Sequence, residues 1–132
     1  MNKQVFHKEV QEFILSNLNA DISKILLKGS SFPEISIQEI VQQIVGKQKA
    51  NKKLPTWFKN QKIYYPPKLN LEQTSSEVTA QYKSRLVNGN SCIDITGGFG
   101  IDSYYFSKNF KEVVHCEINS ELSNLKRPFQ TF

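Results

Sequence analysis

Residues 91–122 read SCIDITGGFGIDSYYFSKNFKEVVHCEINSEL, and this stretch decides the fold of the chain. It begins with a short, mostly apolar and β-branched run, Cys92–Ile95, which is soon followed by glycine, as a buried strand often is. Residues 101–107 place aromatic side chains and an isoleucine at helical spacing, and residues 111–117 hold a second apolar run. This order of strand, glycine turn, helix and strand predicts one βαβ unit with parallel strands and a right-handed crossover.

The glycines of the turn indicate a ligand. Gly97, Gly98 and Gly100 lack a Cβ, so the backbone can take a positive φ and a ligand can approach it closely. The helix that follows offers free N–H groups and a positive dipole end. Glu117 ends the second strand about 20 residues later, where a carboxylate can accept hydrogen bonds from ribose hydroxyls. The turn therefore predicts a nucleotide-binding site, with a purely structural connection as the alternative.

The sequence of the turn disfavours NAD as its ligand. A dinucleotide fingerprint has three glycines, and here Ser103 occupies the third position. Asp94, four residues before Gly98, would repel a pyrophosphate and would suit a cationic or ammonium-bearing ligand. Another nucleotide binder of Rossmann type is therefore a weaker hypothesis.

The turn and its flanking acids resemble a known family. Asp94-x-x-x-Gly98-x-Gly100, followed by Glu117, is similar to the first two motifs of class I S-adenosylmethionine (SAM) dependent methyltransferases. The fuller string DITGGFGID at 94–102, together with EQTSSE at 72–77, resembles one bacterial group of these proteins. That group has a helical N-terminal region and, in longer members, a THUMP-like C-terminal region. The resemblance covers most of the chain, although its specific motifs lie only within 72–122.

The resemblance implies SAM as the cofactor and a set of residues that bind it. These residues are Asp94, Thr96, Gly97, Gly98, Phe99, Gly100, Asp102 and Glu117. The backbone of 97–100 would approach the methionine part, Asp94 its ammonium group and Glu117 the ribose. Asp102 would add a contact at the start of the helix. No catalytic residue can be named, because in this superfamily the acceptor-side residues usually follow later strands.

The length of 132 residues allows one domain with a modest core, or a small domain and part of another. A complete doubly wound sheet needs more strand–helix units than can follow residue 91. We therefore expect an α-rich α/β chain that is the front end of a methyltransferase and is inactive alone. Its parts would be a helical domain at 1–50, a basic, aromatic and proline-containing linker at 51–70, and a truncated Rossmann-type unit at 71–132.

Apolar periodicity predicts helices before the glycine turn. The first helix should run from Lys3 to Asn17, a second should end at Gly29, and a third should begin at a capping box made by Ser36 and Glu39. Residues 66–71 should be extended because of their prolines.

The helix expected after residue 73 begins with three hydroxyl residues. Thr74 and Glu77 form a second capping box, and the apolar face of this helix should be Val78, Tyr82 and Leu86. The hydroxyls at 74–76 either donate hydrogen bonds to the cofactor or only cap the helix.

The segment after residue 46 is basic and aromatic. Its lysines occur with no acidic residue between Glu39 and Glu72, and they are Lys47, Lys49, Lys52, Lys53, Lys59, Lys62 and Lys68. The rings of Trp57, Phe58, Tyr64 and Tyr65 are interleaved with them. Such a segment can hold an RNA backbone while bases stack on the rings, whereas the alternative is a solvated connector whose rings lie on the domain surface.

The net charge of +5 suggests an anionic partner. Together with the THUMP-like region of the family, the basic segment makes RNA the expected substrate class. The competing hypothesis is a non-enzymatic module that binds nucleic acid or protein and retains a vestigial nucleotide-binding turn.

Cys92 and Cys116 fall in predicted buried strands without CxxC or Cys/His spacing. They are expected to be reduced core residues of a cytoplasmic protein, with no metal site. The sequence shows no apolar signal region and no segment of membrane-spanning length, so no membrane partner is expected. A two-strand parallel sheet leaves one edge and one face uncovered, which predicts a homodimer through that surface.

Overall fold

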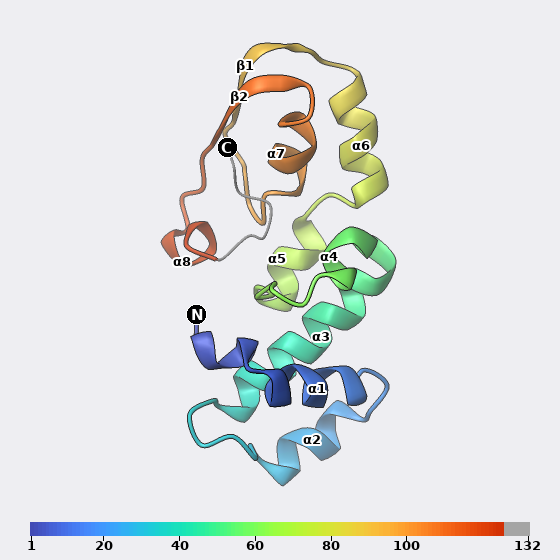
Figure 1. The fold of residues 1–132 in the computed structure, drawn as a ribbon, viewed down its shortest axis with the longest axis vertical. Coiled ribbons are helices and arrows are strands. Elements are labelled where there is room, and N and C mark those ends of the chain that lie inside the picture. Colours follow the sequence, from blue (N-terminus) through green and yellow to red (C-terminus); the bar gives the residue numbers. More distant parts are fainter. Residues whose placement is uncertain (126–132) are drawn as a thin grey trace. The chain divides into compact units, whose positions relative to one another are not determined.

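The computed structural model describes residues 1–125 and shows a helix-rich α/β chain with one small parallel sheet (Figure 1). The chain divides into two compact units, with the boundary between residues 68 and 69. The first unit is helical and the second contains the βαβ arrangement, so the predicted fold class is confirmed. The last seven residues of the predicted unit 71–132 lie outside the described residues.

The first unit is built around one long helix. Its elements are η1 (Lys3–Phe6), α1 (Lys8–Ser16), α2 (Ile22–Lys28), α3 (Ile37–Lys53) and α4 (Pro55–Lys59). Helix α3 contacts α1, α2 and α4, and it contributes Ile40, Ile44 and Ala50 to the core. Because these residues recur at helical spacing, α3 presents one buried stripe to its neighbours.

The ends of these helices follow local side-chain chemistry. Ser36 caps α3 by accepting a hydrogen bond from the amide of Glu39 at 3.2 Å, as predicted. Asp21 caps α2 through the amide of Ser23 at 2.9 Å, and Gly29 ends that helix with φ of 75°. The capping box is incomplete, because the Glu39 carboxylate accepts from the amide of Asn2 instead of from Ser36.

The single helix predicted from Lys3 to Asn17 is wrong. His7 is extended, with ψ of 143°, and separates the short turn η1 from α1. The amide side chain of Gln11 donates to the carbonyl of Val5 at 2.7 Å and so replaces a backbone helical bond at that point. Asn2 caps the separate turn through the amide of Gln4. Apolar periodicity did not reveal this break, because it carries no information about such side-chain bonds.

Most of the predicted linker 51–70 lies inside the first unit, because buried polar contacts tie it to α3. Gln43 is buried, accepts from the amide of Tyr65 at 2.7 Å and donates to its carbonyl at 3.0 Å. The phenol of Tyr64 donates to the Glu39 carboxylate. Burial raises the pKa of both tyrosines above the ordinary value. The rings of Trp57, Tyr64 and Tyr65 are therefore core residues and are not exposed for base stacking.

The second unit holds the sheet. Its elements are α5 (Lys68–Gln73), α6 (Glu77–Arg85), β1 (Gly89–Asp94), α7 (Ile101–Phe106), β2 (Phe110–His115) and α8 (Ser120–Ser123). The strands are parallel, as predicted, and Cys92 lies opposite Val113 while Asp94 lies opposite His115. Helix α7 contacts both strands, and α6 contacts α7 (Figure 1). The sheet is thus covered by α7 on one face.

Four local predictions in this unit are wrong. Residues 68–73 form α5 and are not extended. Helix α6 is capped by Ser76, which accepts from the amide of Thr79 at 3.1 Å, and not by Thr74. The predicted apolar face of α6 is exposed, because α6 turns its small residues, among them Ala80 and Ser84, inward. Cys116 is exposed because it follows the end of β2, whereas Cys92 is partly buried, and both are free thiols.

None of the helices within residues 1–125 is long and apolar enough to cross a membrane.

Candidate functional site

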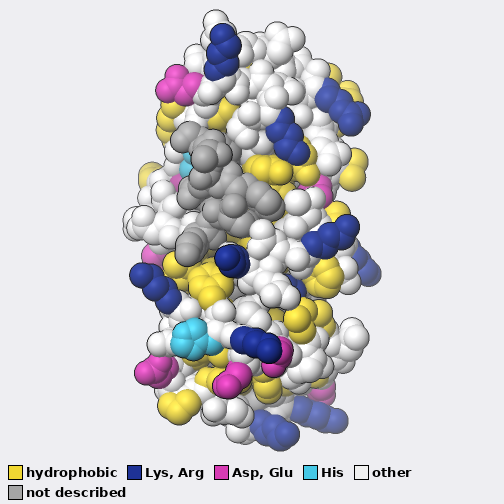
Figure 2. Space-filling view, viewed as in Figure 1, with side chains coloured by type: hydrophobic (Ala, Val, Ile, Leu, Met, Phe, Trp, Pro, Cys, Tyr) yellow, Lys and Arg dark blue, Asp and Glu magenta, His cyan; other side chains and the backbone are white. Residues whose placement is uncertain are grey.

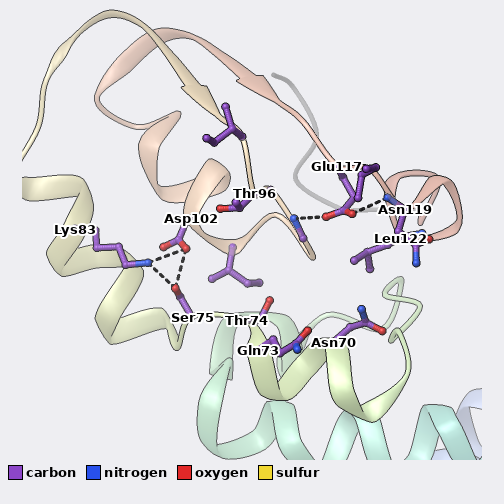
Figure 3. A pocket seen from close by; sticks show the side chains of 15 residues that line it. Asn70, Gln73, Thr74, Ser75, Lys83, Thr96, Asp102, Glu117, Asn119 and Leu122 are labelled. Carbon is purple, nitrogen blue, oxygen red and sulfur yellow. Dashed lines mark hydrogen bonds and ion pairs between the residues drawn. The ribbon is translucent and has the colours of Figure 1, made fainter.

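A cavity of about 510 Å³ lies at the carboxyl ends of β1 and β2. Its walls come from five segments of the second unit, as Figure 3 shows. These segments are the end of α5 with the loop that follows it, Lys83 of α6, the turn at 95–98, the first turn of α7, and residues 117–122. The open ends of parallel strands meet at this edge, which is where α/β folds bind ligands.

The structure brings five of the eight predicted cofactor residues to this cavity. They are Thr96, Gly97, Gly98, Asp102 and Glu117. The other three, Asp94, Phe99 and Gly100, do not line it. Phe99 is a core residue at 2% exposure, and Gly100 is the buried N-cap of α7. The glycine turn therefore contributes both to a ligand site and to the interior.

The three glycines are required for different reasons. Gly98 and Gly100 have φ of 52° and 82°, the left-handed region that side chains disfavour. A Cβ on Gly97 would overlap the imidazole of His115, so Gly97 is needed because this ring packs directly against it. A Cβ on Gly98 would meet only the carbonyl of Thr96, at 3.7 Å. The space at Gly98 is thus open to a ligand, whereas the space at Gly97 is filled by the protein.

Asp94 is bound within the fold. Its carboxylate accepts from the hydroxyl of Ser103 at 2.6 Å and from the amide of Thr96 at 3.2 Å. Ser103 Oγ also lies 2.8 Å from Nδ1 of His115. Because a serine hydroxyl has one proton, and this one goes to Asp94, Nδ1–H of His115 must donate to Ser103. A chain of hydrogen bonds therefore joins the ends of both strands to α7.

Glu117 connects the end of β2 to the glycine turn. Its Oε2 accepts from the amide of Gly98 at 2.8 Å, and its Oε1 accepts from the amide of Asn119 at 2.8 Å. A carboxylate can accept about four hydrogen bonds, so these two leave room for ligand hydroxyls. In Figure 3 the Glu117 side chain points from β2 toward the turn that lines the cavity.

A second charged group lines the cavity at the α6 side. Lys83 Nζ donates to Asp102 Oδ2 at 2.9 Å and to Ser75 Oγ at 2.8 Å, and Ser75 donates to Asp102 Oδ2 at 2.7 Å (Figure 3). Sequence reasoning named Asp102 and Ser75 but missed Lys83. Lys83 carries no motif, and it meets Asp102, 19 residues away, only because α6 packs on α7.

The described residues contain no group of three His, Cys, Asp or Glu side chains that could hold a metal ion. The chemistry that this cavity offers is therefore hydrogen bonding and charge: a carboxylate and an open backbone at one side, and a lysine paired with an aspartate at the other. Apolar side chains of Ile101, Ile118 and Leu122 complete its walls.

A comparison with solved structures finds a protein that resembles this chain over most of its length. It comes from Porphyromonas gingivalis W83 and is described as a "putative methyltransferase". The two are 28% identical with a TM-score of 0.73, and the match covers 93% of this chain. The match covers 31% of that relative's chain, so this chain spans about a third of the relative's length.

Neither the protein-family models nor the curated proteins include a significant match. The structural likeness by itself supports a relationship to methyltransferases.

Proposed function

We propose that the second unit forms the SAM-binding front of a class I methyltransferase, and that RNA is the methyl acceptor of the complete enzyme. The observation that carries the proposal is the cavity at the carboxyl ends of the strands, where the amide of Gly98 and the carboxylate of Glu117 meet. The likeness to the Porphyromonas gingivalis protein supports methyl transfer as the type of reaction.

The residues of the cavity fit an adenosyl ligand. The open position at Gly98 allows close approach to the backbone. Glu117 retains acceptor capacity for ribose hydroxyls beyond its two backbone bonds. The apolar side chains of Ile118 and Leu122 lie on the same side of the cavity as Glu117 and suit a purine ring.

SAM supplies a methyl group on a sulfonium, which a nucleophile can attack. The contribution of this chain is to hold the donor in one orientation, which removes part of the entropic barrier to in-line attack. The hydrogen bond from the amide of Gly98 to Glu117 ties the turn to the end of β2. We assign no catalytic residue among residues 1–125.

RNA as the acceptor rests on the exposed lysines of the first unit. Lys52, Lys59, Lys62 and Lys68 are exposed and can contact phosphates. Lys47 cannot serve in this way, because it is buried at 3% exposure, its ammonium lies 5.5 Å from the ring centre of Phe58, and burial lowers its pKa. On the face that Figure 2 shows, Lys and Arg side chains lie at several separate places.

The experiment that tests cofactor binding is thermal unfolding with and without SAM or its demethylated product. A ligand at 100 times its Kd should stabilise the native state by about 2.7 kcal/mol. Glu117→Gln should remove most of this shift while one side-chain oxygen still accepts from Gly98. Glu112→Gln is the matched control, since Glu112 lies exposed on β2 and does not line the cavity.

Two results would contradict the proposal: no shift with the unmodified chain, or a shift that Glu117→Gln leaves unchanged. The non-enzymatic alternative gives a different pattern. RNA binding in a gel-shift assay that survives Asp94→Ala and Gly98→Val, without any response to SAM, would favour a binding module.

A further inference from the structure

We propose that Lys83 binds the α-carboxylate of the ligand's amino-acid end and thereby makes the cavity selective for adenosyl ligands that carry a free carboxylate. This inference rests on the proposed function, because it assumes that an adenosyl ligand occupies the cavity. It places recognition of the amino-acid end at Lys83, which Asp102 and Ser75 hold, whereas the resemblance places the ammonium group of that end near Asp94.

Asp94 is poorly placed to recognise the amino-acid end. Both of its oxygens already accept hydrogen bonds, from Ser103 and from the amide of Thr96, and the residue does not line the cavity. One of these partners, Ser103, is buried at 0% exposure, so that oxygen of Asp94 is used inside the fold.

Lys83 is placed to recognise it. The side chain is 44% exposed, lines the cavity, and is held by Asp102 and Ser75 at 2.9 and 2.8 Å. An ammonium has three N–H donors, and these two bonds use two of them. Within residues 1–125 the third N–H has no protein acceptor, which leaves it for a ligand. The lysine is thus fixed in position without being saturated.

The residues at the two ends of the cavity predict the orientation of the bound ligand. Glu117 lies at one side of the glycine turn and Lys83 at the other, as Figure 3 shows. A ligand whose ribose meets Glu117 would extend its amino-acid chain across the turn toward Lys83.

The charges of the lining favour a zwitterion over a phosphate. The charged residues that line the cavity are Lys83, Asp102 and Glu117, one cation against two carboxylates. A ligand with several phosphate charges would meet net repulsion there, whereas one carboxylate beside an ammonium and a sulfonium would not. Among anionic groups, a single carboxylate that can reach Lys83 is therefore the best fit.

The test compares SAM with decarboxylated SAM, which differ only in the carboxylate, by isothermal titration calorimetry. The unmodified chain should bind SAM roughly ten-fold more tightly, as expected for one charged hydrogen bond. Lys83→Met should abolish this preference by weakening SAM alone, and Lys83→Arg should keep part of it. Arg85→Met is the matched control, a cation on the same helix that lines a separate groove with Tyr105 and Lys108.

Each outcome separates the inference from the proposed function. Equal affinity for both ligands, with binding that depends on Glu117, would overturn the role of Lys83 and leave the cofactor site intact. Equal weakening of both ligands by Lys83→Met would show a merely structural role. Binding of neither ligand would overturn the proposed function and this inference with it. Where Lys83→Met fails to fold, which ligand-free thermal unfolding reports, Lys83→Arg still tests whether the preference depends on Lys83, and equal affinity of the unmodified chain for both ligands still overturns the inference.

Discussion

The two faces of the β1–β2 sheet differ in what they do. The face toward α7 carries Asp94, Val113 and His115, and its polar groups bond to Ser103 of α7. The other face carries Ile93 and Val114, a register pair, at 63% and 42% exposure. Parallel sheets usually have both faces covered. Strand alternation therefore decides the role of each residue: the same six-residue strand places Asp94 inside and Ile93 outside.

The comparison also explains how the glycine motif works. The covered face holds the turn, because His115 fills the space that a side chain on Gly97 would need. One residue later, the space beside Gly98 is open, and the amide of Gly98 donates to Glu117. Within the glycine motif, some residues thus stabilise the turn and others are open to a ligand.

Gly97→Ala should have the largest effect, because it breaks the covered face. The new Cβ would overlap His115, which cannot move without losing its bond to Ser103. We expect a loss of about 3 kcal/mol in the free energy of unfolding, measured by urea denaturation. Gly98→Ala is the control, with a cost of about 1 kcal/mol from its positive φ alone. Equal costs would show that His115 does not determine the residue at 97.

Ser103→Ala should come next. It removes the donor to Asp94 and the acceptor for His115, and both partners are then left short of a hydrogen bond, at a cost of about 2 kcal/mol. Ser107→Ala on the same helix removes only a local bond to the carbonyl of Tyr104, so it should cost about 0.5 kcal/mol. A stability of Ser103→Ala within error of that control would contradict the role of this hydrogen-bond chain.

Much of this fold could be predicted from the sequence, because its decisive signals are local. The apolar runs and glycines of 91–122 predicted both strands, the helix between them and their parallel pairing. The cap at Ser36 and the end of the second helix at Gly29 were likewise readable from neighbouring residues. Such features depend on contacts within a few positions along the chain.

The features that the sequence did not predict depend on packing between segments that are far apart in the chain. Val78, Tyr82 and Leu86 have the spacing of a buried face, yet α6 turns small residues inward and leaves these exposed at 62–77%. The basic segment looked like a linker, and its burial depends on bonds between Gln43 and Tyr65, 22 residues apart. The position of Lys83 beside Asp102 depends in the same way on how α6 meets α7.

Val113 and Val114 are neighbours in β2 and lie on opposite faces of the sheet, so their variants allow the two faces to be compared within one strand. Val113→Ala removes methyl groups from a side chain at 4% exposure that faces α7, so the free energy of unfolding should fall by about 2 kcal/mol. Val114→Ala removes the same atoms from the open face, and the loss should be about 0.5 kcal/mol. Urea denaturation of both variants measures the difference. Equal losses would mean that the second face is also covered in solution.

The last prediction concerns the open face of the sheet, where we expect the smallest effect on the stability of the monomer. We propose that two copies of the chain associate through this face. Ile93 and Val114 are an exposed apolar pair on this face, and burying them against a second copy would remove them from water. Ile93→Lys should leave the stability of the monomer nearly unchanged, since the side chain is already exposed, but should shift the mass measured by light scattering from dimer to monomer. Val78→Lys, at a similarly exposed position on α6, is the control and should not change the mass. A monomeric mass for the unmodified chain would exclude this association, and a loss of dimer in both variants would place the contact elsewhere than on the sheet.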